Sequence, residues 1–390
     1  MSRVTRAVIN LTALKNNLDI VRQAAPLQKI MAVVKADAYG HGVSRVAKSL
    51  SEVLSNDDAF AVASIDEAIM LRSIGIKHSI VVLEGFNSSK DLSLLQQHNI
   101  SIVVHHLSQI ILLELNPVEA RNIKIWLKID TGMHRLGFAP DDVKKMYQRL
   151  LATGVDTEIN LMTHLANADD RLDIKSEQQI EAFNQIVSGN PAETSLANSA
   201  AILAWPTAHG HWVRPGIMLY GVNPFSENKE TQEVEPDAKS AQGSDSISIK
   251  DKSLEKELQP VMTLSASLIA VNKVFKGSAI GYGGAWVCPE DMSVGVVSIG
   301  YGDGYPRHAP SGTPVLVNGK RVPLVGRVSM DMLMVDLRGL PNAKVGDEVI
   351  LWGEGLPVEE IALAADTIGY ELLCGVTKRV TFEYSEGDAS

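Results

Sequence analysis

Lys35 is the residue in this sequence whose type and position best suit covalent chemistry. It follows the apolar run 30–34, which is typical of a buried strand, and it precedes a turn that contains Gly40 and Gly42. In α/β folds, active sites lie at the carboxyl ends of such strands. Burial there lowers the pKa of a lysine, and the neutral amine is a nucleophile that forms Schiff bases. We therefore predict a Schiff-base lysine at position 35.

Four further segments carry polar side chains that can act together with Lys35. They are 128–137 (KIDTGMHRLG) with Lys128 and Arg135, 162–169 (MTHLANAD) with His164, 196–200 (LANSA) with Ser199, and 214–221 (RPGIMLYG) with Arg214, Gly216 and Ile217. The last two follow the expected seventh strand and surround the eighth, where barrels commonly bind phosphate. A hydroxyl from Ser199 and backbone amides near Gly216 are suitable donors. A nucleophilic lysine and a phosphate cup in one site predict pyridoxal 5′-phosphate.

The elements that must position these residues alternate between strand and helix. We predict strands over 30–35, 59–64, 79–83, 100–104, 123–130, 158–163, 194–197 and 216–220, and helices over stretches such as 43–54, 65–74 and 174–187. Eight such alternations predict an α/β fold, a (β/α)8 barrel of the TIM type. Its catalytic groups then lie at the carboxyl ends of the strands, where Lys35, Lys128 and His164 are expected.

The chain after the expected barrel has a different composition. Residues 226–259 are rich in Glu, Lys, Ser, Asp and Gln and contain no aromatic residue, which predicts an acidic polar insertion or linker. Beyond Pro260, strands are expected over 261–274, 292–299, 314–317, 333–337 and 348–352, and Asn318-Gly319 is typical of a tight hairpin. We therefore predict a barrel of residues 1–225, a linker of 226–259 and a mainly β domain of 260–390.

Bulk composition excludes several classes of partner. A formal net charge of −10 gives no electrostatic basis for binding nucleic acid. No apolar run approaches the ~18 residues of a membrane span, and the first residues lack the apolar core of a signal peptide. Cys288 and Cys374 have no metal-like or redox spacing, and His209 and His211 have no acidic ligand beside them, so no metal site is expected. A cytoplasmic protein that acts on a small molecule is the simplest interpretation.

The β domain contains glycine-rich loops in which a backbone or a tyrosine can approach a ligand closely. Tyr282 lies in GYGGAW (281–286), and Tyr301 lies in GYGDGY (300–305). Met330 and Asp331 lie in GRVSMD (326–331), and Tyr384 lies near the C-terminus. None of these features alone predicts a function.

Taken in order, the motifs resemble those of bacterial alanine racemases, a family of fold-type III pyridoxal-phosphate enzymes. The resemblance is carried by AVVKADAYGHG, KIDTGMHRLGF, MTHLANAD, RPGIMLYG, GYGGAW and GRVSMDM, and it runs from Lys35 to Tyr384 except for 226–259. It implies an isomerase that interconverts L- and D-alanine for peptidoglycan synthesis. It also implies a homodimer with shared active sites.

The resemblance assigns a role to each motif residue. Lys35 would hold pyridoxal phosphate as an aldimine and act as one base, and Tyr282 of the partner subunit would be the opposite base. Tyr39, Ser199, Gly216, Ile217 and Tyr384 would hold the phosphate, Arg214 would face the pyridine nitrogen, and His164 would link Arg214 to Tyr282. Arg135 would lie near the phenolic oxygen of the cofactor and would bind the substrate carboxylate together with Met330, with Asp331 nearby. Tyr301 would be a residue of the entry gate. Lys128 would be carbamylated, and its added negative charge would orient Arg135.

Racemisation accounts for a pair of bases, because the Cα proton leaves from one face and returns to the other. Each positioned acid or base is typically worth ~10²–10⁴-fold in rate. Three alternatives remain open from the sequence: a racemase for serine or several amino acids, a fold-type III decarboxylase, and a non-catalytic carrier of the cofactor. Such carriers usually lack a β domain, so the Tyr282 and Met330 motifs argue against the last of these.

Overall fold

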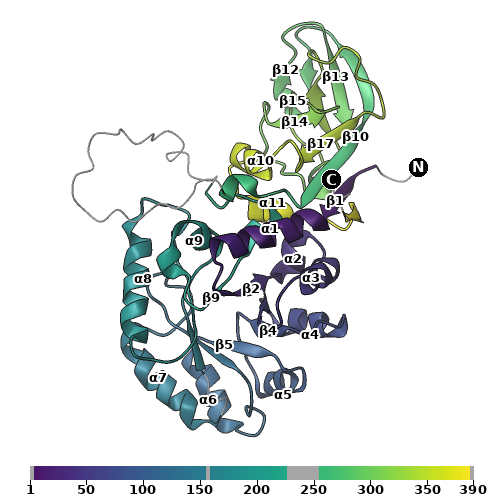
Figure 1. Ribbon diagram of the computed structural model, residues 1–390. Helices are drawn as coiled ribbons and strands as arrows, with labels where there is room; N and C mark the ends of the chain where they lie inside the picture. Colours follow the sequence, from purple (N-terminus) through teal and green to yellow (C-terminus); the bar gives the residue numbers. More distant parts are fainter. Residues whose placement is uncertain (1–3, 155–158, 226–253, 387–390) are drawn as a thin grey trace, which may run out of the picture.

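The computed structural model of the chain consists of a parallel β barrel surrounded by helices and a mainly β domain that stands on it (Figure 1). It describes residues 4–154, 159–225 and 254–386. This arrangement confirms the predicted fold class. The predicted linker lies largely outside the described residues, apart from the short 3-10 helix η3 (Leu254–Glu257) near its end.

The barrel closes through eight consecutive parallel strands. They are β2 (Lys29–Val33), β3 (Ala59–Val62), β4 (Ser79–Val82), β5 (Ser101–Val104), β6 (Ile125–Lys128), β7 (Ile159–Met162), β8 (Thr194–Ser195) and β9 (Trp212–Val213). Strand β3 is buried along its whole length, because parallel strands are covered on both faces. That double burial explains why barrel strands such as β3 and β5 are continuous apolar runs in the sequence.

The helices around the barrel follow the strands in order. They are α3 (Val43–Ser51), α4 (Ile65–Ser73), α5 (Ser89–Gln97), α6 (Leu107–Leu115), α7 (Pro140–Ala152), α8 (Ile174–Val187) and α9 (Ser199–Ala204), while α1 (Leu11–Ala24) precedes the barrel and α2 (Lys35–Gly40) follows β2. Capping boxes begin three of them: Ser64 and Glu67 start α4, Ser88 and Asp91 start α5, and His106 and Gln109 start α6. The caps fix where the connecting loops at the barrel mouth end.

The predicted eighth strand over 216–220 is wrong. The eighth strand is β9, and the segment Ile217–Tyr220 is instead a 3-10 helix, η2. Pro215 has no backbone N–H for a strand ladder, so regular pairing ends before it. Residues 217–220 are nevertheless fully buried, and a short buried helix has the same apolar pattern as a buried strand.

The second domain is built around one long strand. β10 (Met262–Val274) pairs antiparallel with β17 (Glu348–Trp352) through its first half and with β13 (Met292–Val297) through its second half. With β14 (Pro314–Val317), β15 (Lys320–Val325) and β16 (Leu333–Asp336), these strands form a closed ring. The hairpin predicted at Asn318-Gly319 is confirmed, since both residues have positive φ (49° and 73°) between β14 and β15.

The remaining elements of this domain are short. They are β11 (Ala279–Ile280), η4 (Tyr282–Gly284), β12 (Trp286–Val287), η5 (Tyr301–Asp303), α10 (Val358–Ala364), α11 (Gly369–Cys374) and β18 (Thr381–Ser385).

One strand from the start of the chain belongs to the second domain. β1 (Arg6–Asn10) pairs antiparallel with β10 and parallel with β18, so residues 6–10 join the β sheet and not the barrel. Figure 1 shows this strand at the junction of the two domains, beside the C-terminal end of the chain. This strand was not predicted from the sequence, where residues 1–225 were expected to form the barrel. Because β1 belongs to this sheet, helix α1, which follows it, starts at the junction of the two domains. Strands from both ends of the chain, β1 and β18, therefore lie side by side in the sheet of the second domain.

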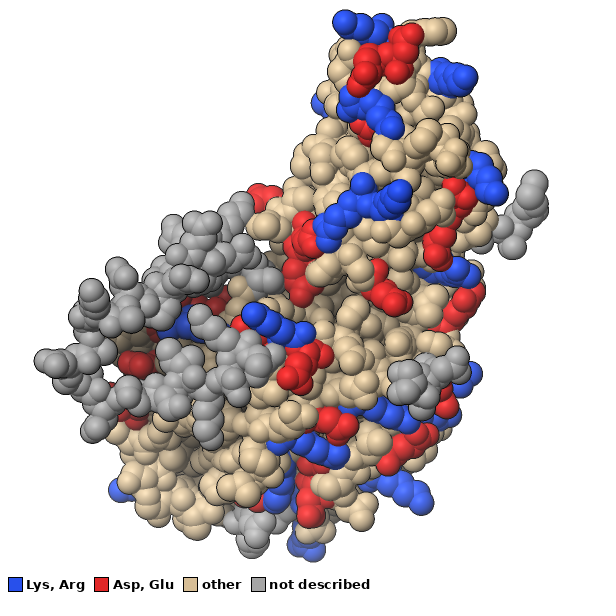
Figure 2. Space-filling model, turned by 45° about the horizontal axis from the view of Figure 1, so that its top comes forward, with Lys and Arg blue, Asp and Glu red and all other residues tan. Residues whose placement is uncertain are grey.

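The face of the molecule shown in Figure 2 carries charges of both signs. Lys and Arg side chains are interspersed with Asp and Glu side chains on the face shown in Figure 2, without a large patch of one sign. No helix in the described part of the chain is long and apolar enough to cross a membrane.

Candidate active site

A cavity of about 730 Å³ lies at the carboxyl ends of the barrel strands. The structure brings nine of the predicted site residues together in its lining. They are Lys35, Tyr39, Lys128, Arg135, His164, Ser199, Arg214, Gly216 and Ile217. These residues lie at or just after the carboxyl ends of five different strands, and the barrel explains why they meet.

The cavity is strongly cationic although the whole chain is acidic. Lys35, Lys128, Arg135 and Arg214 all line it, and Glu84 is the one carboxylate among the lining residues that the structure describes. Burial, followed by the positive charges of Arg214, Arg135 and Lys35, lowers the pKa of Lys128 to about 8. This concentration of positive charge suits a ligand with anionic groups such as phosphate and carboxylate.

The backbone after Lys35 forms a left-handed helical turn. Residues 36–39 all have φ between 52° and 55°, and none of them is glycine. Such a conformation costs roughly 1–2 kcal/mol per residue for L-amino acids. Sequence reasoning predicted a turn here but missed its handedness, because alanine, aspartate and tyrosine give no signal for positive φ. Strain of this size is typical of functional sites.

Hydrogen bonds from three side chains hold this turn in place. Asp37 accepts from the Val43 amide (2.7 Å), and Glu67 accepts from the Ala36 amide (2.8 Å). The Nδ1–H of His41 donates to the carbonyl oxygens of Tyr39 (2.9 Å) and Ala38. Burial lowers the pKa of His41 to about 4, so this ring stays neutral and structural. The turn thereby fixes Lys35 and Tyr39 on the same cavity.

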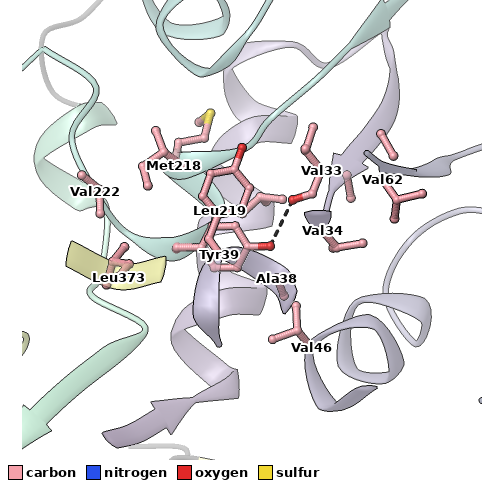
Figure 3. Packing of buried hydrophobic residues seen from close by; sticks show 14 of the residues in the cluster. Val33, Val34, Ala38, Tyr39, Val46, Val62, Met218, Leu219, Val222 and Leu373 are labelled. Atoms are coloured by element: carbon pink, nitrogen blue, oxygen red, sulfur yellow. Dashed lines mark hydrogen bonds between the residues drawn. The ribbon is translucent and has the colours of Figure 1, made fainter. Parts of the chain in front are cut away.

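The predicted phosphate cup has a defined geometry. The Ser199 hydroxyl accepts hydrogen bonds from the amides of Gly216 (2.9 Å) and Met218 (3.3 Å), which leaves its own O–H to donate to an anion. Tyr39 stacks on Tyr220, with ring centroids 4.7 Å apart. Figure 3 shows Tyr39 in the apolar cluster that includes Val33, and Tyr220 in turn donates to the Val33 carbonyl oxygen (3.0 Å).

Gly216→Ala is expected to weaken the binding of pyridoxal phosphate. A Cβ at position 216 would lie 2.5 Å from the Tyr39 hydroxyl oxygen, which is held by the stack on Tyr220. Displacing that hydroxyl removes about one hydrogen bond, so the dissociation constant measured by absorbance titration should rise about tenfold.

A double variant provides the control for this prediction. In Gly216→Ala/Tyr39→Phe the clashing oxygen is absent, so its affinity should equal that of Tyr39→Phe alone. Wild-type affinity in the Gly216→Ala single variant would contradict the proposed cup.

Arg214 and His164 form a buried polar pair behind the cup. The Arg214 guanidinium donates to Ser195 Oγ (2.6 Å), to the carbonyl oxygens of Thr163 and Leu196, and to His164 Nδ1 (3.2 Å). Burial lowers the pKa of Arg214 to about 10, so it remains charged at neutral pH. Burial and the neighbouring cations hold the pKa of His164 well below its usual value. His164 is therefore neutral, and with Nδ1 as acceptor its proton lies on Nε2.

The loop that carries Arg135 is organised by one carboxylate. Asp130 Oδ1 accepts hydrogen bonds from the amides of Gly132, Met133 and His134, at 3.0–3.1 Å. Three N–H donors on one oxygen hold the loop after β6 in a compact turn. Asp130, which the sequence placed at this strand end, thus positions Arg135 from outside the cavity lining.

The structure does not place Tyr384 in the cavity. Tyr384 lies on β18, and its hydroxyl packs against Gly42, where an added Cβ would be only 2.0 Å away. Tyr370, on α11, lines the cavity instead, with its ring 5.9 Å from that of Tyr39. The predicted phosphate role of Tyr384 is therefore not supported by its position, and Tyr370 is the tyrosine that sequence reasoning missed.

Besides Tyr384, four more predicted residues lie outside this cavity, on the second domain. Tyr282 is 72% exposed, Met330 is 53% exposed, and Tyr301 and Asp331 are also exposed. Among the described residues, no group of three or more His, Cys, Asp or Glu side chains could hold a metal ion.

The donor set fits pyridoxal phosphate. A lysine amine, a Ser hydroxyl beside backbone amides, two tyrosine rings and buried cationic side chains converge on one cavity of sufficient size. Fold and site together define a class of enzyme, with a lysine and an anion-binding cup at the mouth of a (β/α)8 barrel and a β domain attached.

Comparison with known proteins assigns the chain more closely. Two family models match it, "Alanine racemase, N-terminal domain" over residues 9–224 and "Alanine racemase, C-terminal domain" over residues 261–384. The curated alanine racemase of Coxiella burnetii (strain RSA 493 / Nine Mile phase I) is 49% identical over 383 residues, covering 98% of this chain and 99% of the relative. That of Halorhodospira halophila is 46% identical over 389 residues, which cover 100% of both.

Solved structures agree with this assignment. The biosynthetic alanine racemase from Pseudomonas aeruginosa has a TM-score of 0.87 and 42% identity, with 99% of this chain and 100% of that chain covered. The alanine racemase from Bartonella henselae "with covalently bound pyridoxal phosphate" has a TM-score of 0.83 and 27% identity, covering 98% of this chain and 99% of that chain. The chain belongs to the alanine racemase family, and it is an enzyme. The predicted family is confirmed.

Proposed function

We propose that this enzyme interconverts L- and D-alanine with pyridoxal phosphate in the barrel cavity, using Lys35 and Tyr282 of a second copy as opposite bases. The observation that carries the proposal is that the two expected bases lie on different domains of the chain, and only one of them lines the cavity. The lysine and the anion cup line one cavity, while Tyr282 is exposed on the other domain. The reaction named for the curated relatives supports alanine as the substrate. In this proposal the D-alanine serves peptidoglycan synthesis.

The cofactor contributes the electron sink that makes the Cα–H of an amino acid acidic enough to remove. Lys35 would hold it, and Ser199 and Tyr39 would bind its phosphate together with Tyr370 and the amides near Gly216. Arg214 would face the ring nitrogen. Its guanidinium has only uncharged hydrogen-bond partners among the described residues, so it presents a full positive charge there.

Lys35 accepts or returns the Cα proton on one face of the substrate, and the Tyr282 oxygen does the same on the other. The neutral His164 supports this second role. Its Nδ1 accepts from Arg214, so Nε2–H is the donor that can reach a tyrosine oxygen entering the cavity. Such a donor stabilises the negative charge that the phenol oxygen carries once its proton has left.

A second copy of the chain is required for this arrangement. The cavity lining that the structure describes contains Tyr370 from the second domain but not Tyr282, Tyr301 or Met330. A two-fold homodimer brings the same surface of each chain to the other, so each cavity receives these three residues once. Arg135 of the chain that forms the cavity and Met330 of the partner subunit would then bind the substrate carboxylate. Asp331 of the partner subunit would lie nearby, and Tyr301 of the partner subunit would lie at the mouth.

Carbamylation of Lys128 belongs to the same proposal. Carbon dioxide reacts with a neutral amine, and a pKa of about 8 gives Lys128 a large neutral fraction near that pH. The carbamate fraction should therefore fall as the pH drops below about 8 and the amine is protonated. In [13C]bicarbonate, wild-type protein should show a carbamate resonance that strengthens as the pH rises through this range. Persistence of that resonance in Lys128→Gln would contradict the assignment.

Chiral analysis of alanine incubated with the protein in D₂O tests the function. Purified protein loaded with pyridoxal phosphate should convert L-alanine to D-alanine that carries deuterium at Cα. The same assay with L-serine distinguishes a broad-specificity racemase, and carbon dioxide release distinguishes a decarboxylase. A coloured protein that leaves alanine, serine and other amino acids unchanged would refute the proposal and indicate a carrier.

A further inference from the structure

We propose that Arg379 is a positioning residue for the surface that the second domain presents to the other copy's cavity. It ties together the loop 300–305, which carries Tyr301, and the loop 329–332, which carries Met330 and Asp331. The inference rests on the proposed function, because those loops act on substrate only if they complete the partner's site. It adds a residue that contacts neither cofactor nor substrate.

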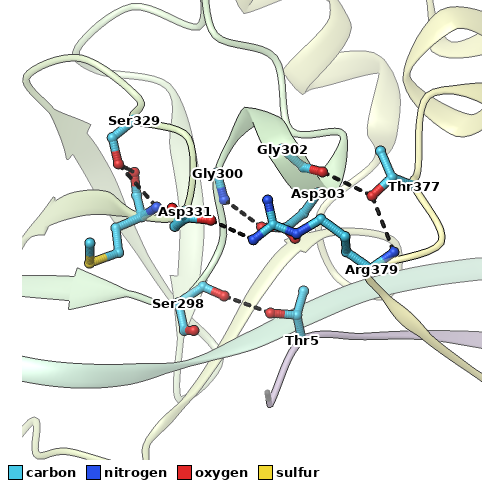
Figure 4. A network of polar contacts seen from close by, with 10 residues as sticks. Thr5, Ser298, Gly300, Gly302, Asp303, Ser329, Asp331, Thr377 and Arg379 are labelled. Carbon is cyan, nitrogen blue, oxygen red and sulfur yellow. Dashed lines mark hydrogen bonds and ion pairs between the residues drawn. The ribbon is translucent and has the colours of Figure 1, made fainter. Parts of the chain in front are cut away.

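The side chain of Arg379 bridges one carboxylate from each loop. Its guanidinium pairs with Asp331 of one loop, and its Nε lies 3.4 Å from Asp303 Oδ1 of the other. Figure 4 shows the guanidinium between these two carboxylates. A Cβ at Gly302 would be 2.2 Å from Arg379 Nη1, so the glycine makes room for this packing. A planar fork of donors suits such a bridge, and a lysine ammonium does not reproduce it.

The buried carboxylate of Asp303 requires a positive charge beside it, and Arg379 supplies that charge. Asp303 is fully buried, and its Oδ2 accepts a hydrogen bond from the Gly300 amide (3.0 Å) at the start of η5. A buried carboxylate stays charged only where opposite charge or hydrogen bonds compensate it. Removing Arg379 takes the positive charge from this carboxylate, and the loop that Asp303 organises is the one that presents Tyr301.

Backbone hydrogen bonds transmit the constraint between the loops. The Tyr301 amide donates to the Ser329 carbonyl oxygen (3.0 Å), and the Gly302 amide donates to that of Met330 (2.9 Å). Thr377, two residues before Arg379, donates its amide to the Asp303 carbonyl oxygen and its hydroxyl to that of Gly302. The loops and the segment 377–379 therefore form one unit.

This unit also connects, within one chain, a residue that lines the chain's own cavity with the loops proposed to enter the cavity of the other copy. Helix α11 places Tyr370 in the cavity of its own chain, and the segment that follows it places Arg379 beneath the loops that face the other copy. Arg379 lies nine positions after Tyr370 in the sequence. Loss of Arg379 should loosen the loops while the lining from the barrel, including Lys35, stays unchanged.

Arg338 offers a closely matched control. It also bridges two carboxylates, the buried Asp336 (2.7 Å) and the exposed Glu290 (2.6 Å). Its side chain is 40% exposed, against 41% for Arg379. It follows β16 at the strand end opposite to the loop 329–332. Arg338→Gln therefore removes an equivalent ion-pair bridge without touching the proposed unit.

The experiment compares Arg379→Gln with Arg338→Gln in the full-length holoenzyme. Arg379→Gln should raise KM for L-alanine about tenfold with a smaller change in kcat, because the substrate-facing loops are misplaced while the bases remain. Arg338→Gln should leave KM within about twofold of wild type. Amide hydrogen exchange at Tyr301 and Gly302 should accelerate in Arg379→Gln and not in Arg338→Gln.

Equal KM values in the two variants, together with unchanged exchange at Tyr301 and Gly302, would overturn the inference. If Arg379→Gln does not fold, Arg379→Lys keeps the charge without the fork and should give an intermediate rise in KM; wild-type KM and exchange in that variant would also overturn it. An inactive wild type would refute the proposed function instead. The exchange measurement needs no activity and still decides whether Arg379 fixes the loops.

Discussion

Lys35→Ala is expected to lower kcat/KM for L-alanine by at least about 10³-fold, because it removes both a base and the nucleophile for the cofactor. The fold makes this lysine hard to replace. The left-handed turn of residues 36–39 fixes the backbone on its C-terminal side, so another lysine cannot shift into its place. Lys128 lines the same cavity but comes from β6. The rate is measured by chiral analysis in both directions.

Lys29→Ala is the matched control for this prediction. Lys29 begins β2, the strand that Lys35 follows, and it lies at the opposite end of the barrel, paired with Glu193 (2.6 Å). Removing a half-exposed surface ion pair is worth only ~0–1 kcal/mol of stability, so activity should stay within about twofold. A Lys35→Ala variant that retains a tenth of the wild-type rate would exclude Lys35 from catalysis.

Tyr282→Phe should have the second largest effect, a loss of ~10²–10⁴-fold in racemisation. The change deletes one oxygen from a side chain that is 72% exposed on its own chain, so the fold of each chain should stay intact. The cofactor colour, which depends on Lys35, should persist. The remaining base, Lys35, still exchanges the Cα proton on its own face. Deuterium should therefore be incorporated from D₂O into one enantiomer of alanine much faster than into the other.

Tyr147→Phe serves as the control, since Tyr147 lies on the outer helix α7, away from the cavity lining. Its activity should match wild type. If Tyr282→Phe racemises alanine at the wild-type rate, or exchanges deuterium into both enantiomers equally, Tyr282 is not the second base.

The barrel was predictable because its physical cause is local. Parallel strands covered on both faces must be apolar throughout, and residues 59–62 or 101–104 show this directly. The eighth strand was misplaced because the buried helix η2 has the same apolar pattern, and Pro215 was the signal that separates them. Most of the nine barrel residues of the site were predictable because they lie in motifs at or near strand ends. The role of Tyr39 was implied only by the resemblance to alanine racemases.

The missed features depend on contacts that are distant in sequence. β1 pairs Ala7 with Leu264 and Ile9 with Tyr384, so nothing near residues 6–10 indicates its sheet. Tyr370 and Tyr384 are both tyrosines near the C-terminus, and only the packing of α11 beside Tyr39 shows which one reaches the cavity. The left-handed turn after Lys35 depends on Asp37, Glu67 and His41, whose joint hydrogen bonding no residue pattern reveals.

The central claim is that each cavity is completed by the other copy, and a hybrid dimer tests it most directly. Lys35→Ala and Tyr282→Phe chains carrying different tags are co-expressed, and the mixed dimer is isolated by both tags. If Tyr282 acts across the interface, one of its two sites contains both bases, and activity returns to about half the wild-type value. If Tyr282 acts within its own chain, both sites lack a base, and the hybrid stays as inactive as either parent variant.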